Sequence, residues 1–283
     1  MQAPPRKAAL VRIEELDADV LMFIGDEAES VATAFIDGGD VLLVDTLAGA
    51  HDAGRLRDVL CTQMRKSVRM LAATHFMSDH LAGVTLFPDA LLMAHRHHRH
   101  AFLSQNRRVD AFYRAPDLVF DNMAIRFGRH ELRFLHNPGK TMDHVSVDVP
   151  SADLTCVGDN IVGNIVYLSR ADPALLRAAI GRIRQFGRGR IVGGHMGAFP
   201  SAALDNALHY LDRLRDTVVD IRTQSAGVAA DGRIAAIRIE DCLAPQVEPS
   251  PFEREWHANN LDVIVAQSIF ALDAALAQRA EAA

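Results

Sequence analysis

The chain has 283 residues, of which 49% are hydrophobic and 23% are charged, a composition typical of globular proteins. Its net charge of −6 argues against a protein that binds nucleic acid through a general positive field. Three scattered cysteines, Cys61, Cys156 and Cys242, are too few for a disulfide framework and favour a reducing, cytoplasmic location. We find no signal peptide and no apolar run of about 18 residues, so no membrane span is expected.

Hydrophobic patterning predicts short buried strands in the first half of the chain. Apolar runs bounded by turn residues indicate strands, and stripes at helical spacing indicate amphipathic helices. Strands are predicted at 20–24, 31–36, 41–44, 68–73 and 91–94, helices at 56–64 and 97–105, and a hairpin that joins 123–127 to 131–136 around Gly128.

The second half is predicted to add two strands and three longer helices. Alternating valines indicate a half-buried strand, and Asp172, Pro173 and Gly187 stand where the N-cap, first residue and terminating glycine of a helix are expected. Strands that alternate with helices, without a long linker, predict a single α/β domain over residues 1–283 with helices packed outside sheets. The strands are predicted at 145–149 and 154–157, the helices at 173–186, 204–221 and 261–272, and a polar connection at 232–251.

Polar residues directly follow several predicted strands, which is where sites are usually built. In the richest of these segments, residues 74–80, Asp79 and His80 are adjacent and can point together only from a loop or a helix start. Carboxylate and imidazole groups are the donors that divalent metals of intermediate hardness prefer. Three further segments combine glycine with a polar residue: Pro138-Gly139-Lys140-Thr141, Gly158-Asp159 and Gly194-His195.

In this order the motifs THxxxDH, PGxT, GD and GH resemble the metallo-β-lactamase superfamily, which includes glyoxalase II-like hydrolases. The resemblance runs over a motif core at about 20–197, and a helical part follows at about 200–283. It implies a four-layer αββα sandwich with a metal site between its loops. Carried over by position, it implies that the family's second metal would be held by Asp79, His80, Asp159 and His195.

Two departures from the family pattern fall on the first metal. That ion would need His75 and two more histidines, at the positions where Met77 and Lys140 stand. A thioether is a weak ligand for zinc, and a protonated lysine has no lone pair to donate. The resemblance therefore implies one divalent metal, with zinc expected first and iron or manganese as alternatives, because two histidines and two carboxylates suit all three.

With one metal, the expected activity is hydrolysis of an ester, thioester, lactone or amide by a metal-activated water. His75, freed from binding metal, would be the general base, Lys140 would replace the positive charge of the missing ion, and Asp79 would complete the catalytic set. The structural alternatives are a vestigial His75 and a solvated turn lysine at 140. Two other functions stay open: a biosynthetic or redox enzyme with mononuclear iron, and a degraded member that binds a ligand without catalysis.

Several nearby residues are assigned supporting roles. The resemblance implies that Asp45 orients a metal ligand rather than binding the ion. His144 is expected to make a structural hydrogen bond, Met77 to pack against apolar neighbours, and Cys156 to lie in the core. The segment 253–260, which holds Trp256 and His257, is expected to fold back over the cleft.

The substrate is expected to be a small molecule, and basic residues suggest that it is anionic. The His/Arg cluster at 95–100 is predicted to lie at a strand end and on an exposed helix near the cleft mouth, rather than to bind metal. No nucleic-acid or membrane partner is expected, and a homodimer stays open. The other residues that hint at an anionic or aromatic partner are Arg107, Arg108, Tyr113 and Arg114.

Overall fold

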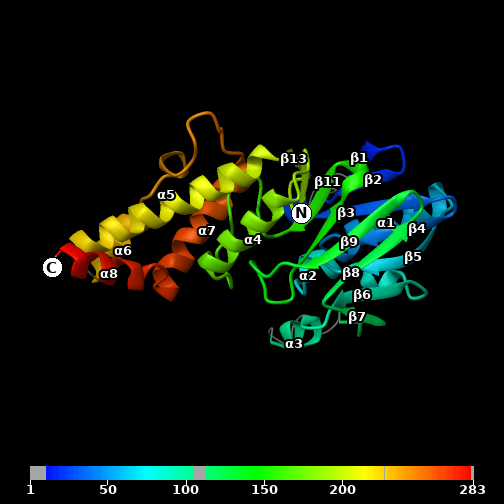
Figure 1. Ribbon diagram of the computed structural model, residues 1–283, viewed down its shortest axis with the longest axis horizontal. Coiled ribbons are helices and arrows are strands. Elements are labelled where there is room, and N and C mark those ends of the chain that lie inside the picture. The colour runs from blue at the N-terminus through cyan, green and yellow to red at the C-terminus, as the bar shows by residue number, and fades with distance from the viewer. Residues whose placement is uncertain (1–10, 105–112, 226, 282–283) are drawn as a thin grey trace, which may run out of the picture.

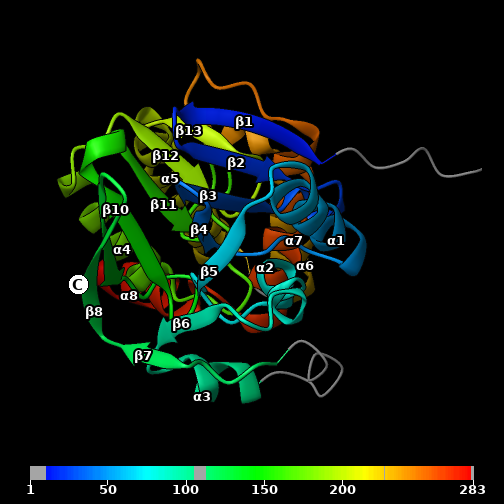
Figure 2. The ribbon, with the colours of Figure 1, turned by 90° about the vertical axis from the view of Figure 1, so that its right-hand side faces the viewer.

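Two β-sheets pack face to face, and helices cover the outer side of each sheet (Figures 1 and 2). The computed structural model describes residues 11–104, 113–225 and 227–281. The four-layer αββα sandwich predicted from the sequence is confirmed. No helix in the described ranges combines the length and apolar character that crossing a membrane requires.

The first sheet is built from the first half of the chain, and its strands follow sequence order. Neighbouring strands are antiparallel from β1 to β4 and parallel from β4 to β7. Because parallel strands end at the same edge, β4 and β5 deliver Asp45 and Thr74 side by side. The strands are β1 (Arg12–Asp17), β2 (Val20–Ile24), β3 (Val31–Asp37), β4 (Asp40–Val44), β5 (Ser67–Ala72), β6 (Leu91–His95) and β7 (Leu118–Phe120).

The second sheet has the order β13-β12-β11-β10-β9-β8. Its only parallel pair within the described residues is β11 with β12, so the loops after these strands, which carry Asp159 and His195, leave the same edge. The strands are β8 (Asn122–Phe127), β9 (His130–His136), β10 (Val145–Val149), β11 (Leu154–Gly158), β12 (Arg190–Gly193) and β13 (Ala198–Pro200).

The helices divide between the two outer layers. Those near the first sheet are α1 (Ala50–Arg57), which continues as a π-helix over Asp58–Gln63, α2 (Ser78–Leu81) and α3 (His98–Leu103). Those beyond the second sheet are α4 (Pro173–Gln185), α5 (Ala202–Gln224), α6 (Gly227–Ala235), α7 (Pro251–Gln267) and α8 (Ala271–Glu281). The last four form the helical lobe that extends to the left in Figure 1.

Three apolar cores hold the layers together. The central core lies between the sheets and includes Phe35 and Phe134. A second core, with Leu56 and Phe102, fills the space between the first sheet and its helices, and a third, with Leu176 and Tyr210, joins the second sheet to the helical lobe. Burial of these side chains is the main free energy that favours the fold.

The prediction that strand 145–149 is half-buried is wrong, because all five residues of β10 are buried. The polar residues that alternate with its valines have partners inside the protein. Asn137 donates to Ser146 Oγ at 3.0 Å, and Arg188 Nε donates to Asp148 Oδ1 at 2.7 Å. Alternating polarity here marks a strand between two packed layers rather than a solvent face.

Some element boundaries also differ from prediction. The helix expected over 261–272 begins at Pro251, where Ser250 and Glu253 form a capping box, and it ends at Gln267 before a left-handed Ser268. The helix expected over 56–64 begins at Ala50, and α6 occupies the first part of the expected connection at 232–251. Strands β1, β7 and β13 were not predicted because they are short or, in β1, mostly exposed and charged.

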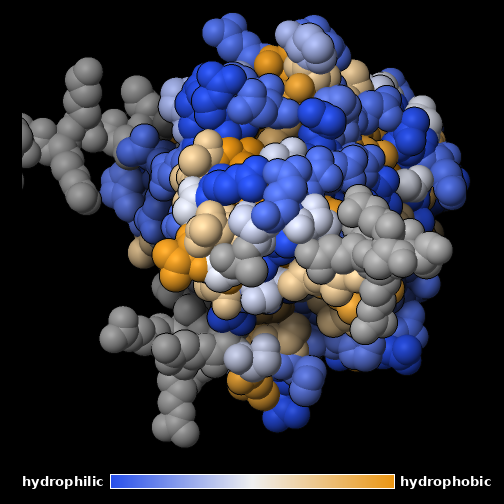
Figure 3. Space-filling view, turned by 90° about the vertical axis from the view of Figure 1, so that its left-hand side faces the viewer, coloured by the Kyte–Doolittle hydropathy of each residue, from blue (hydrophilic) through white to orange (hydrophobic). Residues whose placement is uncertain are grey.

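Figure 3 shows the end of the molecule formed by the helical lobe. Hydrophobic residues there lie in small groups among hydrophilic ones. The most exposed large hydrophobic side chains in the described ranges, Val228 at 89% and Leu272 at 73%, both belong to helices of this lobe. The homodimer that the sequence left open stays a prediction.

Candidate metal centre

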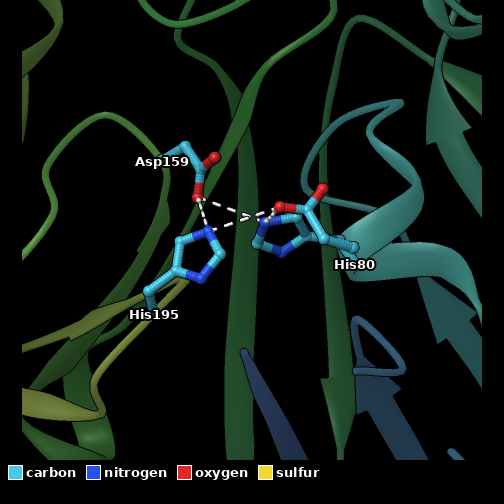
Figure 4. A group of neighbouring side chains, drawn as sticks. His80, Asp159 and His195 are labelled. Atoms are coloured by element: carbon cyan, nitrogen blue, oxygen red, sulfur yellow. Dashed lines mark ion pairs between the residues drawn. The ribbon is translucent and has the colours of Figure 1, made fainter. Parts of the chain in front are cut away.

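The four predicted ligands meet where strands of both sheets end. Asp79 and His80 lie in the first turn of α2, Asp159 follows β11, and His195 follows β12. Figure 4 shows how His80, Asp159 and His195 point toward one another. One donor atom from each lies within 4.8 Å of the others. The shortest separations join Asp159 Oδ1 to His80 Nε2 at 3.2 Å and to His195 Nε2 at 3.4 Å. Asp79 Oδ2 closes the group at 3.6 Å from His195 Nε2.

Three of these donor atoms are buried and have no hydrogen-bond partner among the described residues: His80 Nε2, His195 Nε2 and Asp159 Oδ1. A single buried polar atom without a partner costs about 1–3 kcal/mol, so three that converge point to a missing common partner. Two imidazole nitrogens and two carboxylates form a donor set that a divalent cation fits.

Electrostatics support the same interpretation. Burial alone would lower the pKa of His80, but the carboxylates of Asp159 and Asp79 raise that pKa well above its usual value. Burial would raise the pKa of Asp159, whereas His80, His195 and His75 hold it well below its usual value. Without a metal, a proton on His80 balances the charge of these carboxylates, and a divalent cation would displace that proton.

Hydrogen bonds from outside the group fix the tautomers of both histidine ligands. His195 Nδ1–H donates to the carbonyl of Ala28 at 2.7 Å, and His80 Nδ1–H faces Asp45 Oδ2 at 3.2 Å. In its neutral form each ring therefore presents the lone pair of Nε2 toward the centre. Asp45 is itself held by the backbone N–H of Thr74 at 2.8 Å and by its hydroxyl at 2.7 Å. The contact expected between Asp45 and a ligand is thus present.

Asp45 also adopts a left-handed backbone conformation, with φ of 58°, which is rare for residues other than glycine. Such conformations persist when the surrounding structure holds them, and they cluster at functional sites. The strained residue here is the one that orients His80.

Glycines keep side chains out of the centre. A Cβ added at Gly194 would lie 2.3 Å from Asp159 Oδ1 and 2.6 Å from His80 Cε1. Gly158 has φ of +49°, and a Cβ there would lie 2.6 Å from His144 Nε2. The glycines that precede Asp159 and His195 therefore leave the room that an ion at these four residues would need.

His144 plays the structural role predicted for it. Its Nε2 accepts the backbone N–H of Asp159 at 3.2 Å, which positions that carboxylate. Complete burial lowers the pKa of His144 well below its usual value, and the neighbouring His75 adds to this effect, so the ring stays neutral and can accept.

The family comparison agrees with the geometry. Residues 26–195, more than half of the chain, match the metallo-beta-lactamase superfamily. The chain belongs to this superfamily. Its fold is similar to a metallo-beta-lactamase from Pontibacter korlensis, with a TM-score of 0.63 and 18% identity over 72% of this chain and 99% of that one. A second such enzyme, from Erythrobacter litoralis, gives a TM-score of 0.59 and 18% identity over 71% of this chain and 96% of that one.

The curated relatives are named for one activity within the superfamily, thioesterase. The chain is 24% identical over 165 residues to an atrochrysone carboxyl ACP thioesterase from Aspergillus aculeatus, covering 56% of this chain and 50% of the relative. Another thioesterase of that name, from Emericella nidulans, is 23% identical over 55% of this chain and 48% of its own length. The chain thus spans about half the length of the curated relatives it matches.

His75, at the position where the resemblance places a ligand of the first metal, is fully buried beside the four-residue group. The hydroxyl of Thr74 donates to Asp45, so its oxygen accepts from His75 Nδ1–H at 3.0 Å. The Nε2 atom of His75 lies 3.4 Å from Asp159 Oδ2 and has no hydrogen-bond partner among the described residues.

Lys140 is completely buried, so the interpretation of it as a solvated turn lysine is wrong. Its Nζ donates to the carbonyl of Ser169 at 2.8 Å and lies 3.8 Å from the ring centre of Tyr167. Burial lowers the pKa of Lys140 to about 8, although the carboxylates of Asp159 and Asp79 oppose that shift. Near neutral pH the side chain is therefore a buried cation close to both carboxylates.

Met77 and the cluster at 95–100 do not add metal ligands. Met77 precedes α2 and packs against the core beside the first sheet, as predicted. His95 and His98 are buried, so the prediction of an exposed helix fails for His98, whose Nδ1 lies 3.2 Å from Asp143 Oδ2. Within the described residues, none of this cluster joins a group with metal-binding geometry. The suggested Arg107 and Arg108 lie outside the described residues.

Aromatic side chains beyond the matched family segment reach the centre. Phe252 and Trp256, in the first two turns of α7, lie with ring centres 5.7 Å and 5.6 Å from that of His195. Tyr167 packs edge-on against Trp256 at 4.0 Å. The sequence indicated that the segment with Trp256 approaches the cleft. It gave no motif for Tyr167, and the only signal for Phe252 was its spacing of four residues from Trp256, which places both on one helix face.

Proposed function

We propose that this chain is a hydrolase that works with one divalent metal, held by Asp79, His80, Asp159 and His195, and that its substrate is a thioester. The observation that carries this proposal is the convergence of three unpartnered, buried donor atoms in this group. The positions of the other two family histidines are taken by a packed thioether and a buried ammonium group. The thioester is favoured over an ester, lactone or amide because the curated relatives are thioesterases.

The chemistry divides between the metal and two neighbouring side chains. A divalent metal bound here would lower the pKa of water and polarise a carbonyl group. His75 Nε2, whose tautomer is set through Thr74, would take the proton from the attacking water. The imidazolium that results would lie 3.4 Å from Asp159 Oδ2, which stabilises it.

Lys140 supplies a second positive charge in this mechanism. Its ammonium group donates a hydrogen bond to the carbonyl of Ser169 and is held over the Tyr167 ring. Because a buried charge acts through a low dielectric, this cation would stabilise the negative charge that develops on the substrate carbonyl oxygen. The ammonium group would thus stabilise this negative charge in place of the first metal of two-metal relatives.

An anionic group on the substrate has a candidate binding place nearby. A cleft of about 430 Å³ is lined by Phe76 and Thr141, which adjoin His75 and Lys140 in sequence, and by His97, His100 and the exposed Arg170. We propose that these basic residues bind the anionic end of a small-molecule substrate. Arg170→Gln is expected to raise KM for a coenzyme A thioester about tenfold and to leave an uncharged N-acetylcysteamine thioester unaffected.

Metal analysis is the first test. We expect one zinc per chain after equilibration with zinc, iron and manganese, and less than one tenth of that in His80→Ala and His195→Ala. Two ions per chain would contradict the mononuclear proposal. Iron retained in place of zinc would favour redox chemistry, and no metal at all would indicate a binding protein.

Catalysis is tested on variants that keep the metal. His75→Gln and Lys140→Met are each expected to lower kcat for an acyl thioester by about 10²–10³-fold while the metal content stays at one. The matched control is His136→Gln, whose ring stacks on His95 outside the centre and which should keep full activity. Full activity in both test variants would exclude the proposed roles of His75 and Lys140.

A further inference from the structure

The three aromatic residues near the metal centre, Tyr167, Phe252 and Trp256, form one continuous surface, which we call the aromatic wall. Phe252 and Trp256 lie 5.5 Å apart, and Trp256 meets Tyr167 at 4.0 Å. At one end the wall borders the ring of His195, and at the other it lies under the ammonium group of Lys140. All three residues are partly exposed. The wall therefore runs along the side of the proposed reaction site, from a metal ligand to the buried cation.

Buried polar residues of α7 hold the wall in place. Glu253, 1% exposed, accepts the backbone N–H of Asn164 at 2.7 Å, and Asn260 accepts that of Leu168 at 2.7 Å. Asn260 also donates to the carbonyl of Val166 at 2.7 Å. These bonds tie α7 to the segment that follows Asp159 and carries Tyr167. The wall is thus fixed relative to the metal ligands and is suited to binding rather than to opening and closing.

We propose that the aromatic wall binds the acyl group of the substrate, and that this group is a flat aromatic one. The inference rests on the proposed function, because the occupant of the wall is the acyl part of the thioester that reacts beside His195. Aromatic rings gain about 0.5–1.5 kcal/mol from stacked or edge-on aromatic partners beyond the area they bury. Three partly exposed rings in a row beside the reaction site offer such contacts to a flat acyl group and few special contacts to a short aliphatic one.

A direct binding test is possible because Trp256 is the only tryptophan in the chain. Its fluorescence therefore reports on the wall without any need for catalysis. Titration of the zinc-loaded protein with nitrobenzoate, an aromatic acid that quenches indole emission, should give saturable quenching. Cyclohexanecarboxylate, which is of similar size but not flat, should bind about three- to tenfold more weakly when it competes with nitrobenzoate.

The kinetic test compares benzoyl, cyclohexanecarbonyl and acetyl thioesters of N-acetylcysteamine. Trp256→Leu should raise KM for the benzoyl thioester about tenfold and change KM for the acetyl thioester by less than about threefold. The zinc content should stay at one per chain. Trp256→Phe should restore most of the benzoyl preference. Val263→Ala, elsewhere on α7, is the matched control and should change neither.

The outcomes separate this inference from the proposed function. One outcome is that no thioester is hydrolysed, but nitrobenzoate still quenches Trp256 saturably and binds more tightly than cyclohexanecarboxylate. The proposed hydrolase function is then wrong, and the aromatic wall is still an aromatic-binding surface. If Trp256→Leu loses zinc affinity and shows no acyl preference, the wall only supports His195 and the inference is overturned. Equal binding of the flat and non-flat acids overturns it as well.

Discussion

Single residues carry the proposal that this member of the superfamily binds one metal rather than two. His75 hydrogen bonds through Thr74 to Asp45, the same carboxylate that orients His80. One carboxylate thus sets the tautomers of the proposed base and of a proposed metal ligand. Lys140 places a buried cation near the carboxylates of Asp159 and Asp79, and its burial lowers its pKa to about 8.

Lys140→Met is expected to make the metal-free protein more stable while it abolishes most activity. A pKa lowered from 10.5 to about 8 by burial means that the charged form is disfavoured by roughly 3 kcal/mol in the folded state. The free energy of unfolding at pH 7, from urea denaturation, should rise by up to that amount. Because the unfolded lysine keeps its proton longer, the wild type should itself gain stability as pH rises from about 8 to about 10, and the variant should not. A destabilised variant would contradict this account of the burial.

Gly194→Ala is expected to prevent metal binding without unfolding the protein. The added methyl group would overlap Asp159 Oδ1 and the ring of His80, so the donors must move apart. Zinc affinity, measured by calorimetric titration, should fall by at least about a hundredfold. Gly181→Ala, in α4 with nothing within 4 Å of the added Cβ, is the control and should bind zinc normally. It should also gain about 0.5–1 kcal/mol of stability.

At the scale of elements, the site depends on which strand ends share an edge. The parallel pairs β4–β5 and β11–β12 bring four loops to one edge of the sandwich. α7 then packs its first turns against that edge, although it lies after the segment that matches the family. Its placement depends on polar bonds to the loop after β11 as well as on apolar contacts.

Asn260→Ala should destabilise the protein by about 2–4 kcal/mol. The change leaves the buried N–H of Leu168 and the carbonyl of Val166 without partners, and it removes a contact with Tyr210. Chemical denaturation measures the loss, and the fluorescence of Trp256 should shift because α7 is no longer fixed. Asn259→Ala, one residue earlier and only half-buried, is the control and should change stability by less than about 0.5 kcal/mol.

At the scale of the whole molecule, charged turns connect the two sheets. Asp19, in the turn between β1 and β2, accepts two hydrogen bonds from Arg129, in the turn between β8 and β9, and one from His130, the first residue of β9. His130 is 1% exposed and also contacts Ser151. This cluster links the β1–β2 turn of the first sheet to the start of β9 in the second sheet. None of its residues belongs to the candidate metal centre.

Asp19→Asn is expected to lower stability at neutral pH and to have little effect in acid. The hydrogen bond from Arg129 holds the pKa of Asp19 well below its usual value, so ionised Asp19 stabilises the folded state above about pH 4. As pH falls below that value, the wild type should lose this contribution and approach the variant. Thermal unfolding from pH 7 to pH 2 measures the difference, with the exposed Asp262→Asn as control. A difference that persists unchanged at pH 2 would exclude the ionic explanation.

The sequence by itself determined the layers, most strands and the four candidate ligands. Buried strands and amphipathic helices follow local periodicity, and Asp79, His80, Asp159 and His195 stand directly after strands in motifs that can be read in one dimension. Ordered motifs of this kind predict a site because each one needs a fixed backbone turn, such as the turn that the glycine before Asp159 allows.

Only the tertiary structure decided what lies around those ligands. Burial of Lys140 and of all five residues of β10 depends on layers that pack from distant parts of the chain, and alternation in sequence cannot show how many faces are covered. The same holds for the aromatic wall. Tyr167 and Trp256 are separated by most of the helical lobe in sequence, and they meet because buried hydrogen bonds, whose partners no local pattern names, dock α7 onto the loop after β11.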